Sequence, residues 1–459
     1  MVHTFDVDGR YFALDADSGA VHMLDKMGFD AVSAIQSDGW DKARETCERA
    51  YGKGETEELF ADIRSLQEQG LLFSYDAQLH CPPEGLGKPT VLKAMCLHVA
   101  HDCNLRCRYC FAGTGAFHGQ RLLMPLEVGQ KAIDMLIARS GNRKFLELDF
   151  FGGEPLMNFD VVKQLVAYGK ERAAERGKTI RFTLTTNAYA LTDEIIDFLN
   201  REMENVVLSI DGRKEVHDAL RPTASGEGSY DVSLANAKKL AQARRQQKYY
   251  VRGTFTRNNL DFANDVMRLA EEGFEQISVE PVVLQPSSPY SLLEEHLPAI
   301  LQEYDRLLKL YLESRKTGKW FSFFHFVVDL DGGPCIKKRL SGCGAGSEYV
   351  AVTPDGEIFP CHQFVGREGY RMGNVLTGEL DEDIRAKFAA NHVLAKEECA
   401  SCWARLYCTG GCAANAQAFN GEINKPYKME CAMERKRLEC AIAAYCSENA
   451  SEQEPGAGA

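Results

Sequence analysis

The sequence lacks the features of a membrane or secreted protein. Its 459 residues contain no run approaching the roughly 18 uninterrupted apolar residues that a membrane-spanning helix requires. The opening MVHTFDVDGRYF has no basic segment followed by an apolar run, so it does not read as a secretory signal. We therefore expect a cytoplasmic protein without a membrane partner, built from about two to four domains.

Basic residues are fewer than acidic residues, whereas cysteine is abundant. The chain has 53 Lys and Arg residues against 66 Asp and Glu residues, a formal net charge of −13. Binding to phosphate backbones needs a basic surface, so this balance argues against a nucleic-acid partner. The chain has 16 cysteines, yet disulfide frameworks belong to small secreted domains. Metal or cluster ligation is the better interpretation.

Residues 1–80 read as a small separate module followed by a linker. Three short strands, with turns at Asp8-Gly9 and Ser18-Gly19, precede three helices, the last of which ends at Gly70. Residues 81–90, CPPEGLGKPT, are rich in Pro and Gly and predict a linker.

Strands and helices alternate from residue 91 to about residue 285. The predicted strands cover 91–100, 145–151, 180–187, 205–211, 249–255 and 276–283. Such alternation favours an α/β fold with a parallel sheet and helices packed outside it. Six strands are too few for an eight-stranded barrel, so we expect a partial (β/α)6 barrel, open on one side, within a core of residues 91–330. Residues 292–330 read as helical and aromatic-rich, with the aromatic side chains packed in the core.

The remainder of the chain changes character. Residues 331–446 contain ten of the cysteines among Gly-rich turns and predict a cysteine-rich C-terminal domain. Residues 447–459, SENASEQEPGAGA, are expected to be disordered.

Three cysteines, Cys103, Cys107 and Cys110, follow the first strand of the alternating region in the segment CNLRCRYC. Ligands of α/β folds bind at the carboxyl ends of strands. The spacing is not usual for structural zinc, which closes its site with four ligands, whereas thiolates suit iron–sulfur clusters. A cubane cluster held by three cysteines leaves one iron free for a ligand that is not protein.

This spacing, with Tyr109 at the aromatic position of CxxxCxφC, resembles the signature of the radical S-adenosylmethionine (SAM) enzymes. The resemblance implies that the free iron chelates the amino and carboxylate groups of S-adenosylmethionine. It also implies that Cys103, Cys107 and Cys110 serve catalysis, because an electron passed through their cluster releases a 5′-deoxyadenosyl radical that abstracts hydrogen from the substrate.

Further motifs of the same enzymes follow at the ends of later strands. FFGGEP matches their GGE motif, in which glycines let backbone approach a ligand and Glu154 accepts a hydrogen bond from the methionine ammonium. LTTNA and LSIDG place small polar residues where ribose hydroxyls and the carboxylate bind, and HDALRP resembles an HDxxR stretch whose arginine forks onto the methionine carboxylate. Ordinary turns are the competing interpretation, and whether Asp211 contacts ligand or shapes its turn stays open, as does the orientation of Glu280. The implied cofactor-binding residues are Tyr109, Gly152, Gly153, Glu154, Thr185, Asn187, Ser209, Asp211 and Arg221.

The C-terminal cysteines match the SPASM extension of radical peptide-modifying enzymes, CX9-15GX4C, CX2CX5CX3C and a last Cys. The resemblance implies two auxiliary 4Fe–4S clusters, which makes three in all. One would be held by Cys343, Cys361 and Cys412, and the other by Cys399, Cys402, Cys408 and Cys431. Either Cys335 or a substrate thiolate completes the first auxiliary cluster, and we favour the open site. Two structural zinc sites are the competing interpretation.

The module of residues 1–80 resembles the PqqD-like winged-helix module that binds leader peptides. A leader would add a strand to the edge of the strand AVHMLD, beside the helix TEELFADIRSLQEQG. A capping subdomain without a binding role and a DNA-binding winged helix are the alternatives.

Together, the three parts resemble the maturases of six-cysteines-in-forty-five peptides, which make sactipeptide- or ranthipeptide-type products. The resemblance implies thioether crosslinks from cysteine to an acceptor carbon of a ribosomally made, cysteine-rich precursor peptide that is bound through its leader. It also implies an electron donor such as ferredoxin or flavodoxin. The alternatives are a sulfatase-type maturase that generates formylglycine, and an iron–sulfur electron carrier or redox regulator.

Overall fold

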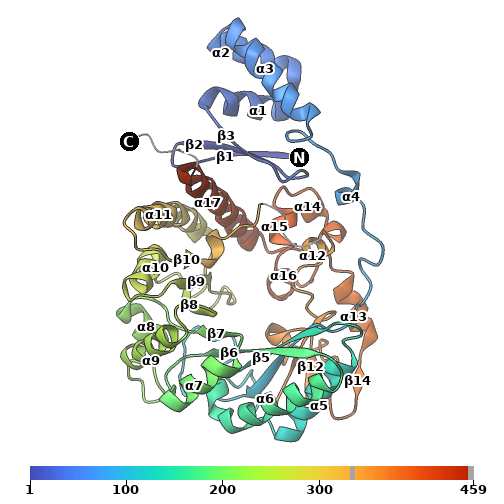
Figure 1. Ribbon diagram of the computed structural model, residues 1–459, viewed down its shortest axis with the longest axis vertical. Coiled ribbons are helices and arrows are strands. Elements are labelled where there is room, and N and C mark those ends of the chain that lie inside the picture. Colours follow the sequence, from blue (N-terminus) through green and yellow to red (C-terminus); the bar gives the residue numbers. More distant parts are fainter. Residues whose placement is uncertain (331–335, 453–459) are drawn as a thin grey trace.

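The computed structural model describes residues 1–330 and 336–452 (Figure 1). Cys335, the candidate fourth ligand of the first auxiliary cluster, lies outside these residues, as does the last part of the expected disordered tail. No helix in the described ranges is long and apolar enough to span a lipid bilayer.

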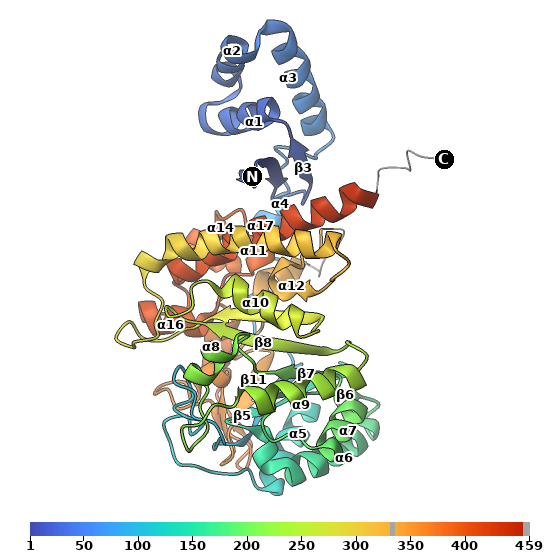
Figure 2. The same ribbon diagram turned by 90° about the vertical axis from the view of Figure 1, so that its left-hand side faces the viewer.

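The N-terminal part forms the three strands and three helices that its sequence predicts. Strands β1 (Val2–Val7), β2 (Arg10–Asp15) and β3 (Val21–Leu24) make an antiparallel sheet. Asp8 and Gly9 form the loop between β1 and β2 with φ of 55° and 73°, as a two-residue hairpin turn requires. Helices α1 (Lys26–Asp38), α2 (Trp40–Tyr51) and α3 (Lys53–Glu68) stand above this sheet (Figure 2).

The six predicted parallel strands are all present and are neighbours in chain order. They are β4 (Ala94–Ala100), β5 (Phe145–Gly152), β6 (Thr179–Thr186), β7 (Asn205–Leu208), β8 (Tyr249–Phe255) and β9 (Gln276–Pro281). The helices between them are α5 (Leu126–Ala138), α6 (Phe159–Ala174), α7 (Asp193–Glu202), α8 (Lys214–Leu220), α9 (Tyr230–Ala243) and α10 (Phe262–Glu271).

The sheet does not stop at six strands, because both of its edges are extended into an 11-stranded sheet. The short strand β10 (Ser322–Phe323) pairs in parallel with β9. On the other side β11 (Tyr349–Val352) pairs in parallel with β4. The antiparallel strands β12 (Glu357–Phe359), β13 (Gly373–Asn374) and β14 (Glu379–Leu380) then follow. The cysteine-rich region is thus built onto the same sheet as the alternating region.

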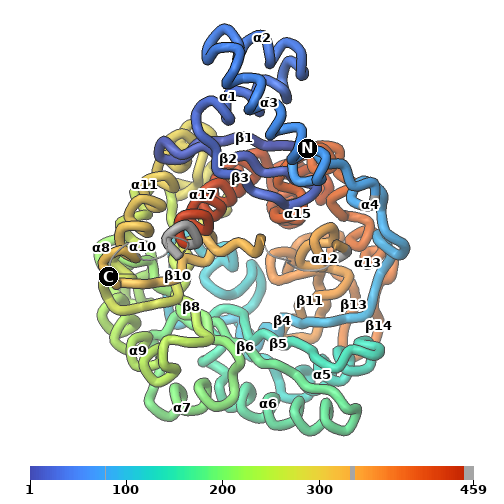
Figure 3. Tube along the Cα trace, turned by 45° about the horizontal axis from the view of Figure 1, so that its top comes forward, coloured from blue at the N-terminus to red at the C-terminus, as the bar shows by residue number. Residues whose placement is uncertain are grey.

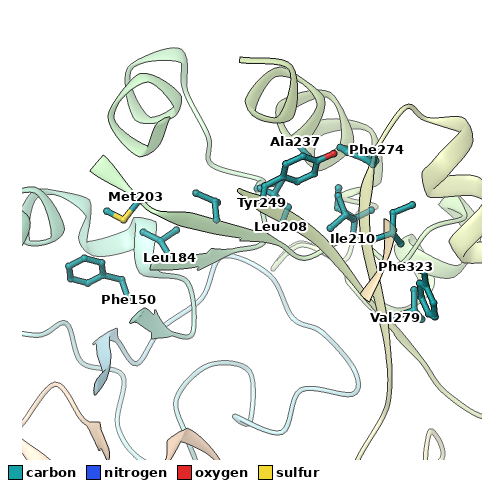
Figure 4. Packing of buried hydrophobic residues seen from close by; sticks show 14 of the residues in the cluster. Phe150, Leu184, Met203, Leu208, Ile210, Ala237, Tyr249, Phe274, Val279 and Phe323 are labelled. Atoms are coloured by element: carbon teal, nitrogen blue, oxygen red, sulfur yellow. The ribbon is translucent and has the colours of Figure 1, made fainter. Parts of the chain in front are cut away.

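Burial alternates along the central strands, and this alternation separates a core face from an open face. Leu146, Leu148 and Phe150 of β5 are buried against the helices, whereas Glu147 and Asp149 point to the opposite side. Figure 4 shows Phe150 with Leu184, Leu208 and Tyr249 in the buried cluster. Parallel sheets are usually covered by apolar residues on both faces. The polar inner positions therefore indicate that this face lines a cavity.

The aromatic segment 320–326 is only partly helical, contrary to expectation. Helix α11 (Leu297–Lys316) ends before it, and the segment forms β10 and a 3-10 turn, η3 (Phe324–Phe326). Phe321, Phe323 and Phe326 are buried as predicted, whereas Trp320 and Phe324 are 45% and 49% exposed. Pairing of Ser322 and Phe323 with β9 makes this part of the segment a short edge strand.

Six α-helices lie within the described residues 336–452 of the C-terminal region. They are α12 (Ile336–Ser341), α13 (Glu382–Ala389), α14 (Glu397–Ala400), α15 (Arg405–Cys408), α16 (Ala413–Asn420) and α17 (Lys428–Glu452). Helix α17 packs along α11 and beneath β1 (Figures 1 and 2). It continues through residues 447–452, which were expected to be disordered. Contacts of Arg10 with Ser447 and of Arg315 with Glu448 hold this last part of the helix.

The N-terminal sheet contacts the cysteine-rich region directly, near α15 (Figure 3). The His3 ring stacks on Trp403 with ring centroids 3.8 Å apart. A nitrogen of Arg405 lies 3.0 Å from a carboxylate oxygen of Asp17, and both side chains are 0% exposed. His80, in the short helix α4 (Ala77–His80) before the linker, also contacts Asp17 at 2.7 Å.

Candidate functional site

A large cavity lies on the open face of the sheet, at the carboxyl ends of the parallel strands. Its volume is about 1150 Å³. Six of the predicted ligand cysteines line it, three from the loop after β4 and three from the C-terminal region: Cys103, Cys107, Cys110, Cys343, Cys361 and Cys412. Two cysteine groups that are far apart in the sequence therefore face one chamber.

The backbone of the three-cysteine loop is held by residues at the end of α8 and just after it. Arg106 N–H donates to Pro222 O at 2.7 Å, and Arg108 N–H donates to Leu220 O at 2.8 Å. At the beginning of the loop, Cys103 N–H donates to Asp102 Oδ1 at 2.8 Å. These bonds fix a loop that has no regular secondary structure of its own.

The two glycines of FFGGEP let backbone approach backbone. A Cβ at Gly152 would lie 2.2 Å from Ala100 O, and one at Gly153 would lie 2.2 Å from Asp102 O. Gly152 also has φ +129°. Gly153 N–H and Glu154 N–H donate to Ala100 O and Asp102 O at 2.7 and 2.9 Å. Close approach to a ligand was expected here, whereas the closest partner in the structure is the strand that carries the cysteine loop.

The thiols of the loop suit metal ligation by their chemistry and surroundings. Burial raises the pKa of Cys103 to about 12 and that of Cys107 to about 11, although Arg221 opposes the shift at Cys107. Deprotonation near neutral pH would therefore need a nearby positive charge such as a metal ion. Within residues 1–330 and 336–452, no three His, Cys, Asp or Glu side chains converge tightly enough to hold a single metal ion. Thiolates that surround a four-iron cluster need not converge on one point.

Tyr109, Asp211 and Arg221 form one buried network. Arg221 donates from Nε and Nη2 to the two oxygens of Asp211 at 2.8 and 2.9 Å. The Tyr109 hydroxyl donates to the same carboxylate at 2.8 Å, and the guanidinium lies over the Tyr109 ring. The Arg221 fork that was expected to bind a methionine carboxylate is thus engaged by Asp211.

Glu154 is buried, and it lies behind the cavity wall. It accepts hydrogen bonds from Thr186 Oγ1 and Asn187 N–H, each at 2.8 Å, and from Leu156 N–H at 3.1 Å. Burial raises its pKa to about 7, and these hydrogen bonds oppose that shift. The Asn187 side chain in turn donates to Asn104 Oδ1 at 2.7 Å.

The predicted cofactor-binding residues divide into two groups. Glu154 and Asp211 stand behind the wall and hold its members, whereas the others line the cavity: Tyr109, Gly152, Gly153, Thr185, Asn187, Ser209 and Arg221. Glu280, whose orientation the sequence left open, also lines the cavity.

Several of the C-terminal cysteines that the SPASM resemblance names lie near one another in the structure. Burial raises the pKa of Cys361 to about 12 and that of Cys412 to about 11, and the nearby Cys343 raises both further. Burial likewise raises the pKa of Cys431 to about 11, with Cys399 and Cys402 close enough to contribute. Cys408 is in turn near Cys431.

An aromatic contact joins the two halves of the cavity wall. The rings of Phe111, next to Cys110, and His362, next to Cys361, have centroids 5.8 Å apart. Phe151 of β5 packs on the same His362 ring at 5.1 Å. The first cysteine loop and the first C-terminal cysteine group are therefore neighbours.

Several cavity residues were not identified from the sequence. They are Asp149, Thr183, Arg252, His362 and Glu430. Asp149, Thr183 and Arg252 are inner-face residues of β5, β6 and β8, where polar side chains alternate with apolar ones. That alternation was the signal that could have revealed them.

Comparison with known proteins agrees with this geometry. The radical SAM superfamily matches residues 97–273, and the SPASM iron-sulfur cluster-binding domain matches residues 343–403. The radical SAM cyclopropyl synthase TigE of Paramaledivibacter caminithermalis is 24% identical over 351 residues, which are 72% of this chain and 70% of that protein. The cysteine-type anaerobic sulfatase-maturating enzyme of Clostridium novyi is 23% identical over 336 residues, 69% of this chain and 86% of the relative.

Two solved structures share the fold. The protein anSMEcpe with bound AdoMet has a TM-score of 0.65 at 20% identity, covering 78% of this chain and 95% of its own. Streptococcus suis SuiB bound to its precursor peptide SuiA has a TM-score of 0.51 at 15% identity, covering 94% of this chain and 98% of its own.

The domain matches agree with the cofactors that the family resemblance implies, which are iron–sulfur clusters and S-adenosylmethionine. The chain therefore combines a radical SAM domain with a SPASM iron–sulfur cluster-binding domain.

Proposed function

We propose that this protein is a peptide maturase that forms thioether crosslinks in a cysteine-rich precursor peptide. The observation that carries the proposal is the shared chamber. Cys103, Cys107 and Cys110 face the same cavity as Cys343, Cys361 and Cys412, and its volume of about 1150 Å³ leaves room for S-adenosylmethionine and a peptide segment.

Three groups of cysteines would each hold a 4Fe–4S cluster: Cys103, Cys107 and Cys110; Cys343, Cys361 and Cys412; and Cys399, Cys402, Cys408 and Cys431. When bound, the first cluster and S-adenosylmethionine supply a carbon radical that removes hydrogen from the substrate. Within the described residues, the first C-terminal group has three cysteines. Its open position would take a substrate cysteine thiolate, with Cys335 as the alternative.

The remaining wall residues would bind and orient S-adenosylmethionine. The wall at the ends of β5, β6 and β7 offers Thr185, Asn187 and Ser209 as hydrogen-bonding groups. Glu154 holds the Asn187 backbone, and Asp211 holds Arg221 beside Cys107. Both acids would thus position the site from behind. Tyr109, which donates to Asp211, would pack beside the first cluster.

The N-terminal module would hold the leader of the precursor. β3 is an edge strand, because it pairs with β2 alone, and a peptide can add to such an edge. Met23 on this strand is 53% exposed. SuiB, whose fold is similar over most of the chain, is described in complex with a precursor peptide. A ferredoxin or flavodoxin would supply electrons in the cytoplasm.

The test is the product that this protein forms from a cysteine-rich precursor peptide, sought among the reading frames beside its gene. We expect a loss of two hydrogens per bridge, together with loss of one alkylatable thiol and no new carbonyl, as measured by mass spectrometry. A peptide without its leader should not be processed. The leaderless peptide is a better probe than deletion of residues 1–80, because that deletion would expose Trp403 and Arg405.

A formylglycine-generating maturase is the second candidate, because the Clostridium novyi relative is a sulfatase-maturating enzyme. It would convert a serine or cysteine to an aldehyde that reacts with hydrazides.

An electron carrier or redox regulator would release no deoxyadenosine from S-adenosylmethionine under dithionite. Absence of that release in cluster-loaded protein would end the enzyme proposal.

A further inference from the structure

Arg252 is an arginine of the cavity wall whose side chain makes no hydrogen bond within residues 1–330 and 336–452. Arg252 lies on the inner face of β8 between Tyr250 and Thr254, and its side chain is 54% exposed although β8 is a central strand. In the described part of the chain, its guanidinium makes no hydrogen bond, and its nearest carboxylate oxygen, on Glu280, is 3.9 Å from Nε. The Arg252 side chain is therefore exposed to the cavity.

Glu280 does not need Arg252 as its partner. His325 Nε2 lies 3.1 Å from one Glu280 oxygen, and the Ser278 hydroxyl donates to the same oxygen at 2.9 Å. Arg437 is 3.9 Å from the other oxygen. This differs from Arg221 and Arg213, whose forks are each engaged by a buried aspartate. Both terminal nitrogens of Arg252 remain available.

The position of Arg252 places it near the expected chemistry. Thr254, two residues further along the same face, donates its N–H to Asp211, which holds Arg221 beside Cys107. A strand advances about 3.3 Å per residue, so Arg252 lies about 7 Å below this rim. Asp149 and His362 line the same cavity, and His362 is adjacent to Cys361.

We propose that Arg252 binds a carboxylate side chain of the precursor peptide, so that the segment presented for crosslinking contains an Asp or Glu residue. This inference rests on the proposed function and names the substrate class of its cavity. A guanidinium fork matches a carboxylate with two parallel hydrogen bonds, and the partial exclusion of water in a cavity strengthens them. Lys93, another cation of the cavity, is already paired with Glu348 at 2.8 Å.

The methionine carboxylate of S-adenosylmethionine has the same chemistry, so the experiment separates the two sources. Each Asp and Glu of the precursor core is replaced by Asn or Gln, and these peptides are tested with the cluster-loaded wild type, Arg252→Gln and Arg252→Lys. The readouts are kcat/KM for bridging, peptide affinity by fluorescence anisotropy, and S-adenosylmethionine affinity by equilibrium dialysis.

With the wild-type protein, one of the peptides in which Asn or Gln replaces an acidic residue should lose about 10- to 100-fold in both affinity and kcat/KM relative to the unchanged peptide. With the Arg252→Gln protein, replacing the same acidic residue of the peptide should change neither affinity nor kcat/KM further, because the arginine that would bind that residue is absent. Arg252→Lys should be intermediate because it keeps the charge but loses the fork. Arg181→Gln is the matched control. It removes an arginine from β6, on the far side of β7 from β8; this side chain stacks on Phe145 and does not line the cavity.

Two outcomes would overturn the inference. The wild type could process every amide peptide as well as the acidic one, or Arg252→Gln could lose affinity for S-adenosylmethionine while keeping its preference for the acidic peptide. If the wild type forms no bridge at all, the proposed function fails instead, and the anisotropy comparison still decides whether Arg252 holds a peptide carboxylate.

Discussion

At the scale of single residues, the site depends on buried charges that satisfy one another. Asp211 accepts hydrogen bonds from Arg221, Tyr109 and the Thr254 backbone. Removing a partner from a buried ion pair leaves an uncompensated charge, which costs far more than losing one neutral hydrogen bond.

Asp211→Ala should therefore reduce the free energy of unfolding by about 3–5 kcal/mol, because Arg221 would remain buried without its partner. Tyr109→Phe removes one hydroxyl donor and keeps the pair, so a loss of about 1 kcal/mol is expected. Urea unfolding of both variants in anaerobic, cluster-loaded protein measures the difference. Equal losses in the two variants would contradict the role given to the ion pair.

Asp149 should make stability depend on pH. Burial raises its pKa from 3.8 to about 6, although Thr183 and Arg252 oppose the shift. The folded state then binds a proton that the unfolded state releases, so this stabilisation is complete below about pH 4 and is lost as the pH rises through about 6.

Relative to Asp149→Asn, the wild type should lose about 1 kcal/mol of unfolding free energy between about pH 5 and about pH 7. Denaturant unfolding at several pH values measures this slope. The exposed Asp160→Asn is the control and should run parallel to the wild type. If the difference in unfolding free energy between the wild type and Asp149→Asn does not change with pH, the Asp149 carboxyl is not desolvated.

At the scale of elements, the end of β5 shapes the cysteine loop. The strand can end against Ala100 and Asp102 only because Gly152 and Gly153 have no side chains. Hydrogen bonds within the sheet fix the strands. The close contacts of Gly152 and Gly153 with Ala100 and Asp102 then position the irregular cysteine loop relative to β5.

Gly153→Ala should displace the backbone at Asp102 and lower the cluster content, because its Cβ would lie 2.2 Å from Asp102 O. We expect most of the iron and sulfide of the first cluster to be lost, with little change in far-ultraviolet circular dichroism. Gly119→Ala, in the same loop, is the control, since its nearest contact is an ordinary 3.6 Å. Full iron content in Gly153→Ala would mean that the loop tolerates the shift.

At the scale of the whole molecule, the N-terminal sheet is attached to the loop that carries the second C-terminal cysteine group. Asp17 and Arg405 form the buried link, and Trp403 stacks on His3 beside it. Arg405 lies between Cys402 and Cys408 in the sequence, so the peptide-binding module that we propose is held close to one of the proposed clusters.

Asp17→Ala should cost about 3–5 kcal/mol and loosen residues 1–80, because Arg405 would remain buried without its carboxylate. Adding Arg405→Met should recover part of that loss, since the unpaired charge is removed as well. Hydrogen exchange of residues 1–80 and urea unfolding follow both effects. Lys239→Ala, which breaks an exposed pair with Asp193, should cost less than about 1 kcal/mol. Strictly additive losses at residues 17 and 405 would contradict this link.

The local elements of this protein could be predicted largely from its sequence, because they depend on short-range pattern. Alternating apolar residues and turn signals identified the six parallel strands and the three-strand, three-helix start of the chain. The exceptions were segment 320–326, where pairing with β9 decided the conformation, and residues 447–452, which contacts from Arg10 and Arg315 keep helical.

The sequence by itself determined the chemistry of the site, because cysteine spacing within a loop limits which metal group the thiols can hold. Only the tertiary structure decided which residues meet. Residues far apart in the chain become neighbours through strand order, so the extension of the sheet by β11, the pairing of Arg221 with Asp211 and the exposure of Arg252 were not readable from local pattern. Side chains on the inner face of a sheet contact side chains of other strands, and the local sequence pattern does not identify these contacts.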